Sequence, residues 1–84
     1  MFLKEPWIRI PGSLRQIDTG YSRAVWGTNR NNQIWKLKRD RKSWKSVSGR
    51  LVHVSPGEGG VWGVNKYRYI YYRLGKMQTT YNID

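Results

Sequence analysis

The sequence predicts an all-β fold made of two copies of one four-stranded sheet unit. The first observation is a repeat, because Val-Trp-Gly-Thr-Asn at residues 25–29 returns as Val-Trp-Gly-Val-Asn at residues 61–65. The second is a series of short β-branched and aromatic runs at roughly ten-residue spacing, each closed by Gly, Pro or Asn. The third is that no apolar pattern keeps a helical period across these turn signals. Four strands in about 37 residues describe a β-propeller blade.

The repeat extends over most of the chain. Trp7 aligns with Trp44 and Gly20 with Gly57 at a separation of 37 residues, and the second Val-Trp-Gly copy follows the first by 36. Self-similarity at a fixed period of this length indicates one supersecondary unit that is used twice.

The first copy begins with a short strand over residues 7–10, which alternates large and polar side chains and stops at a Pro-Gly pair. Strands over residues 14–18, 24–29 and 33–38 follow, and a polar Arg-Asn-Asn turn joins the last two. Gly27 lies in mid-strand, where the missing Cβ indicates close approach of a neighbouring group.

The second copy has the same elements, which are expected over residues 44–47, 51–55, 61–65 and 69–73. Thr80 stands at the position equivalent to Trp44, so we expect a final strand near residues 80–83 to be a degraded copy. We divide the chain into an N-terminal outer strand that completes a neighbouring blade, blade 1 and blade 2, over residues 1–12, 13–48 and 49–84.

The tryptophans lie on predicted strands. A large aromatic ring buries about 150–250 Å², and we expect Trp26 and Trp62 to pack between neighbouring blades. Two blades leave their outer faces bare, and about three repeats are needed to bury a continuous core. The chain therefore either closes a ring with copies of itself or belongs to a longer array.

Composition restricts the class of protein. Sixteen Lys and Arg against five Asp and Glu give a net charge of +11, which favours anionic partners. The absence of cysteine and the single histidine exclude disulfides and a structural zinc site, and we expect no metal and no cofactor. No apolar run approaches the ~20 residues that cross a bilayer, and the N-terminus has no signal-peptide pattern.

Two copies of Val-Trp-Gly-x-Asn, in phase with Trp-x-x-(Ile/Val) and Leu-x-x-(Ile/Val), resemble the tectonin β-propeller repeat of the fish-egg lectin and tachylectin family. The resemblance covers about residues 7–76. It implies a six-bladed propeller that binds N-acetylhexosamine-type sugars or bacterial lipopolysaccharide, often in innate immunity and outside the cell. Three chains of two blades would supply six, so we predict a homotrimer in which residues 7–10 complete the neighbour's blade.

The loops on one propeller face are the predicted carbohydrate site. Asn amides suit sugar hydroxyls, a Tyr ring can stack on a pyranose, and Arg or Lys can hold phosphate or acidic sugar groups. Alternatively, Asn29 and Asn65 each cap a tight turn through an Asx hydrogen bond. The candidate residues are Asn29, Arg30, Asn31, Arg50, Asn65, Lys66, Tyr67 and Arg68.

Three other classes of function fit the sequence less well than a lectin. An enzyme has the weakest support, since Gln16 replaces His53 in the other copy and the five acids form no clustered pair. The main alternative is a polyanion- or nucleic-acid-binding module, because residues 66–73 interleave cations and aromatic rings as single-strand-binding grooves do. A propeller scaffold without a ligand is the third class.

Overall fold

The structure is a computed structural model that describes residues 6–74. In this range the chain forms two antiparallel sheets, one turn of 3-10 helix (η1, Tyr21–Arg23) and no α-helix. The first sheet has the order β1 (Gln16–Thr19), β2 (Val25–Thr28), β3 (Gln33–Leu37), β4 (Trp44–Arg50), and the second has β5 (His53–Pro56), β6 (Gly60–Val64), β7 (Ile70–Leu74). The predicted all-β class is confirmed.

The expectation of a strand over residues 7–10 is wrong for the single chain. These residues form no strand, and within residues 6–74 they pair with no strand of either sheet. The strand expected near residues 80–83 lies outside the described residues. In contrast, β4 is longer than expected and continues to Arg50, where it pairs with Gln33 of β3.

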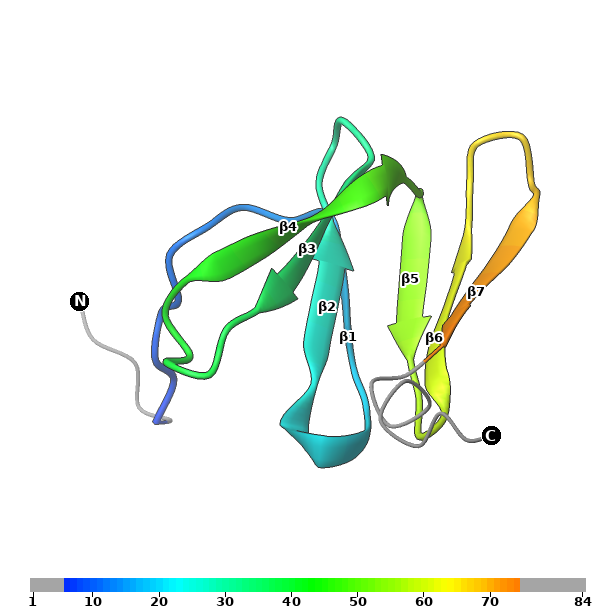
Figure 1. Ribbon diagram of the computed structural model, residues 1–84. Helices are drawn as coiled ribbons and strands as arrows, with labels where there is room; N and C mark the ends of the chain where they lie inside the picture. The colour runs from blue at the N-terminus through cyan, green and yellow to red at the C-terminus, as the bar shows by residue number, and fades with distance from the viewer. Residues whose placement is uncertain (1–5, 75–84) are drawn as a thin grey trace.

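The two sheets meet along β1 and β5 and diverge toward β4 and β7 (Figure 1). Gln16 holds the sheets together, since its Nε2 donates to the Val54 carbonyl at 2.8 Å and its Oε1 accepts from the Val54 N–H at 2.9 Å. The Ser55 hydroxyl donates to Asp18 Oδ2 at 2.8 Å. Asp18 and Ser55 occupy equivalent positions of the two repeats, so this hydrogen bond joins corresponding positions of β1 and β5.

The core lies between the diverging sheets. Trp26, Ile34 and Val54 are buried there, and Leu51 and Val61 pack against them. The prediction that Trp26 packs between the two repeats is therefore confirmed.

Trp62, the repeat equivalent of Trp26, behaves differently. It is 55% exposed and contacts the ring of Tyr72, with 4.7 Å between ring centroids. Two blades were expected to leave their outer faces bare, and in the described residues no third sheet follows β5–β7. The burial of Trp62 against a further blade therefore stays a prediction.

The glycine in mid-strand has the expected role. A Cβ on Gly27 would lie 2.6 Å from both the Gln16 carbonyl oxygen and Leu14 Cδ1, and a Cβ on Gly63 would collide with Leu51 in the same way. Because each glycine has no side chain, a leucine can pack closely over it, Leu14 over Gly27 and Leu51 over Gly63. The two Val-Trp-Gly motifs therefore have the same packing role.

Candidate functional site

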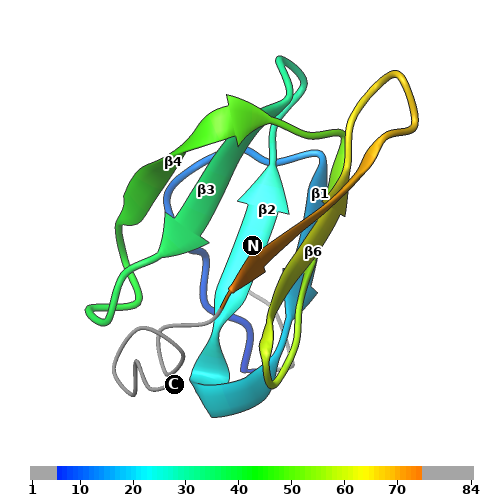
Figure 2. The same ribbon diagram turned by 45° about the vertical axis from the view of Figure 1, so that its right-hand side comes forward.

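Three connections lie at the same end of the two sheets, which we call the turn-bearing end (Figures 1 and 2). They are the β2–β3 turn (residues 29–33), the β4–β5 connection (residues 50–52) and the β6–β7 turn (residues 65–69). The Leu51 N–H donates to the Asn32 carbonyl at 3.0 Å and ties two of them together. All eight predicted site residues belong to these connections or to the residue that ends β4.

The β2–β3 and β6–β7 turns have the same pattern of hydrogen bonds. Asn29 Oδ1 accepts from the backbone N–H groups two and four residues later at 3.0 and 2.9 Å, and Asn65 Oδ1 accepts the same pair, both at 2.9 Å. The fourth residues, Asn32 and Arg68, have left-handed backbone conformations, with φ of 64° and 72°. The alternative that both asparagines cap tight turns is confirmed.

The two turns that the asparagine side chains fix leave their central residues exposed. Arg30 and Asn31 are exposed on the first, and Lys66, Tyr67 and Arg68 on the second. On the second turn the Tyr67 and Tyr69 rings lie 6.2 Å apart, with Lys66 Nζ 5.2 Å from the Tyr67 ring. The β6–β7 turn therefore presents an aromatic pair beside a cation on an ordered backbone.

The turn-bearing end is strongly cationic. Its cations are Arg15, Arg30, Arg50, Lys66 and Arg68. The carboxylates among residues 6–74 lie away from it, in the second half of β1, the β3–β4 turn and the β5–β6 turn; they are Asp18, Asp40 and Glu58. Hydrogen bonds from the Lys42 backbone N–H and the Ser43 side chain and backbone lower the pKa of Asp40. Separation of the charges leaves an end that attracts anionic groups.

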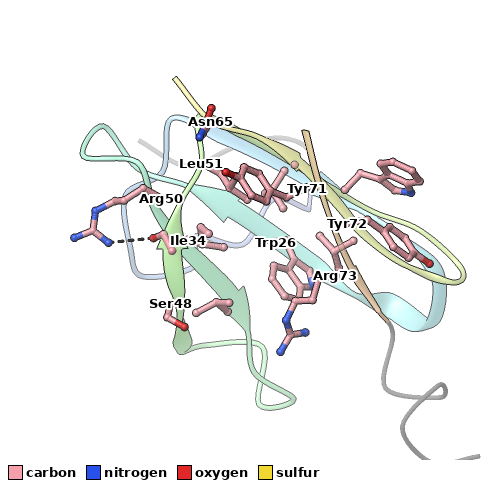
Figure 3. Close-up of a pocket in the computed structure, with 15 residues that line it drawn as sticks. Trp26, Ile34, Ser48, Arg50, Leu51, Asn65, Tyr71, Tyr72 and Arg73 are labelled. Carbon is pink, nitrogen blue, oxygen red and sulfur yellow. Dashed lines mark hydrogen bonds between the residues drawn. The ribbon is translucent and has the colours of Figure 1, made fainter. Parts of the chain in front are cut away.

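A cleft of about 530 Å³ opens between the sheets (Figure 3). Its walls include Trp26 and Ile34 from the first sheet and Tyr71 from the second. The Arg73 guanidinium lies 5.4 Å from the centre of the Trp26 ring. Asn65 lies at the other end of the cleft from this pair (Figure 3).

Sequence reasoning placed only part of this arrangement. Among the eight predicted residues, Arg50 and Asn65 line the cleft, and the other six do not. Tyr71 and Arg73 were missed as cleft residues, although strand alternation puts them on one face of β7. The cleft itself was missed because it depends on the angle between two sheets.

No group of three or more His, Cys, Asp and Glu that could hold a metal ion occurs in residues 6–74. Across the same residues, no helix has the length and apolar character required to span a membrane.

Repeated antiparallel sheets joined through their first strands, with ordered cationic turns at one end, define a β-repeat protein. The Tectonin domain family model matches residues 1–83, and the chain belongs to this family. Tectonin-1 of Physarum polycephalum is 41% identical over 67 residues, which cover 77% of this chain and 30% of that protein. Fish-egg lectin of Cyprinus carpio is 35% identical over 80 residues, which cover 83% of this chain and 32% of that protein. The chain thus spans about a third of the length of these relatives.

Proposed function

We propose that this chain is a lectin module that binds N-acetylhexosamine-type sugars or bacterial lipopolysaccharide through its turn-bearing end. The observation that carries the proposal is the β6–β7 turn, where Tyr67, Tyr69 and Lys66 stand together on a backbone held by Asn65. The similarity to a fish-egg lectin supports the same class of function.

The chemistry of these side chains suits a charged glycan. The exposed face of a tyrosine ring can pack against the apolar face of a pyranose, and amide groups can bond to its hydroxyls. The Arg30 and Arg68 guanidinium groups can each form paired hydrogen bonds with a phosphate or carboxylate. In this proposal the aromatic pair holds the sugar ring and the arginines hold its anionic groups.

Retention on immobilised N-acetylglucosamine and on lipopolysaccharide, followed by elution with free sugar, tests the proposal. We expect Tyr67→Ala to weaken retention by about fivefold or more, since loss of a stacking ring costs roughly 1 kcal/mol or more. Lys42→Ala is the matched control, because Lys42 is an exposed cation in the β3–β4 turn, at the opposite end.

Two outcomes would overturn the lectin proposal. Binding that free sugar does not displace, but that falls steeply with salt, would indicate a polyanion- or nucleic-acid-binding module. Equal retention of Tyr67→Ala and Lys42→Ala would show that the sugar does not bind at the turn-bearing end.

We also infer that copies of the chain associate head to tail, and that three copies of two blades form a six-bladed homotrimer. Trp62, Ile70, Tyr72 and Leu74 are exposed on the second sheet. Each large apolar side chain left in water forgoes about 1.5–3 kcal/mol of burial free energy. The first sheet of another copy would cover these side chains as the second sheet covers Trp26 within the chain.

A further inference from the structure

A second group of cations lies on the first sheet, at the end opposite to the turn-bearing end. The β3–β4 turn (residues 38–43) has the sequence Lys-Arg-Asp-Arg-Lys-Ser, and η1 in the β1–β2 connection ends at Arg23. Figures 1 and 2 show this turn and this connection at the same end of the first sheet. We call their cations the basic surface; they are Arg23, Lys38, Arg39, Arg41 and Lys42.

The two connections that carry the basic surface are ordered and joined. Asp40 Oδ1 accepts from the backbone N–H groups of Lys42 and Ser43 at 2.8 and 3.0 Å, and Asp40 Oδ2 accepts from the Ser43 hydroxyl at 2.8 Å. Arg41 has a left-handed backbone conformation, with φ of 63°, and its Nη1 donates to the Arg23 carbonyl at 3.0 Å. The basic surface is therefore built on a fixed backbone.

The nearby carboxylates leave an excess of positive charge. Both oxygen atoms of Asp40 accept hydrogen bonds within its own turn, and Glu58 belongs to the β5–β6 turn of the second sheet. Asp18, the remaining carboxylate among residues 6–74, accepts from the Ser55 hydroxyl at the junction of the sheets. The exposed side chains of the basic surface are Arg23, Lys38, Arg39 and Lys42.

Two lysines extend the positive charge along the strands that lead into the turn. Lys36 of β3 and Lys45 of β4 are register partners, and directly opposed side chains of an antiparallel pair point to the same face. Like charges in such a pair destabilise the sheet. Lys38 follows Lys36 by two residues, so strand alternation continues the charge on that face. The cations thus form a strip and not a single point.

The second copy shows that a blade does not require this charge. Residues 74–79 are the repeat equivalents of the β3–β4 turn, and they hold one cation where the first copy has four. Tyr72 and Tyr81 stand at the positions of Lys36 and Lys45. The asparagines of the tight turns, in contrast, occur in both copies. The basic surface therefore belongs to the first copy alone, and the sheet architecture does not account for it.

We propose that the basic surface is a second binding site, which holds a linear sulfated polysaccharide. Guanidinium and ammonium groups form charge-assisted hydrogen bonds with anionic oxygens, and a sulfate group presents three such oxygens. A strip of cations complements negative charges that repeat along a polymer. Lys/Arg-rich runs of about five to eight residues are typical of patches that bind heparin or nucleic acid.

The composition of the two connections favours a polysaccharide over a nucleic acid. Single-stranded nucleic acids are held by a series of aromatic rings that stack on successive bases. Residues 38–43 contain no aromatic ring, and Tyr21 is the one ring in residues 20–24. Base edges are commonly read by Asn and Gln amides, and neither residue occurs in these two segments. The basic surface thus recognises charge and offers no platform for bases.

This site is separate from the proposed sugar site at the turn-bearing end. There the Asn65 side chain fixes a turn on which tyrosine rings stand beside cations, whereas the basic surface depends on charge alone. The two proposals can therefore fail independently of each other.

Binding of a short heparin oligosaccharide, measured by fluorescence anisotropy, tests the proposal. We expect Arg39→Glu to weaken binding by about fivefold or more, because the variant loses an exposed ion pair and adds a repulsive charge. Arg15→Glu is the matched control, since it makes the same change of charge at an exposed arginine of the turn-bearing end. The measurement is made at about 0.15 M salt, where the Debye length is about 8 Å and distant charges contribute little. Circular dichroism checks that both variants fold.

A loss of affinity confined to Arg39→Glu supports the proposal. Equal losses from both variants would overturn it in favour of an effect of net charge, and no loss from Arg39→Glu would also overturn it. Tighter binding of a single-stranded oligonucleotide of equal charge, weakened by Arg39→Glu, would indicate a nucleic-acid site instead. Displacement of heparin by free N-acetylglucosamine would place heparin at the turn-bearing end and overturn the second site.

Retention on immobilised N-acetylglucosamine distinguishes failure of this proposal from failure of the lectin proposal. We expect Arg39→Glu to be retained there as the parent protein is, and to be eluted by free sugar. If the parent protein bound heparin through Arg39 but was not retained on the sugar, the lectin proposal would fail and the basic surface would stand.

Discussion

Gln16 shows how much one side chain contributes to the junction between the sheets. Val54 is fully buried, and both of its backbone polar groups bond to the Gln16 amide. His53, at the equivalent position of the second sheet, is exposed, and its Nε2 lies 3.5 Å from Gln16 Nε2. The same repeat position therefore carries a structural role in one copy and an exposed side chain in the other.

We predict that Gln16→Ala lowers the free energy of unfolding by about 1–3 kcal/mol, because it leaves buried backbone groups without partners. Urea denaturation measures this change. His53→Ala is the matched control and should stay within about 0.5 kcal/mol of the parent protein, as exposed substitutions do. Equal losses from both variants would show that the Val54 hydrogen bonds do not hold the sheets together.

The tight turns are the elements that the sequence predicted best. An asparagine at the same position of both copies suggested either a ligand contact or an Asx turn, and the structure shows the turn at Asn29 and Asn65. The information was local, since the hydrogen bonds reach only two and four residues along the chain. Residues 7–10 were predicted less well, because an alternating pattern forms a strand only beside a partner, and within residues 6–74 they pair with none.

We predict that Asn65→Ala lowers the free energy of unfolding by about 1–2 kcal/mol, since two N–H groups lose their shared acceptor. It should also weaken retention on sugar, because the turn that carries Tyr67 and Lys66 loses its fixed shape. Asn65→Asp keeps the acceptor and should preserve stability. If Asn65→Ala weakened retention without any loss of stability, Asn65 would contact the ligand instead of shaping the turn.

At the scale of the whole molecule, the repeat predicted two sheets but not the space between them. The cleft depends on how the sheets diverge from β1 and β5, which side chains at the junction determine. Gln16 and Asp18 make hydrogen bonds to Val54 and Ser55 that link residues 37 or 38 positions apart. No local sequence signal specifies such distant partners. The 37-residue repeat nevertheless places Asp18 and Ser55 at equivalent positions.

The exposure of Trp62 predicts how stability depends on concentration. If copies associate through the second sheet, a higher protein concentration raises the melting temperature by mass action. Trp62→Lys should abolish this dependence, because a charge would have to be buried at the contact. It should leave the melting temperature of the dilute chain nearly unchanged, since Trp62 is more than half exposed there.

Tyr67→Lys is the matched control for this experiment. Tyr67 is also an exposed aromatic residue, 65% exposed, but it stands on the β6–β7 turn and outside the proposed contact. Its variant should retain the concentration dependence and lose retention on sugar. Scanning calorimetry at several concentrations, together with retention on sugar, distinguishes the proposed association surface at Trp62 from the proposed sugar site at Tyr67. A melting temperature of the parent protein that stayed constant over a hundredfold range of concentration would contradict the association through Trp62.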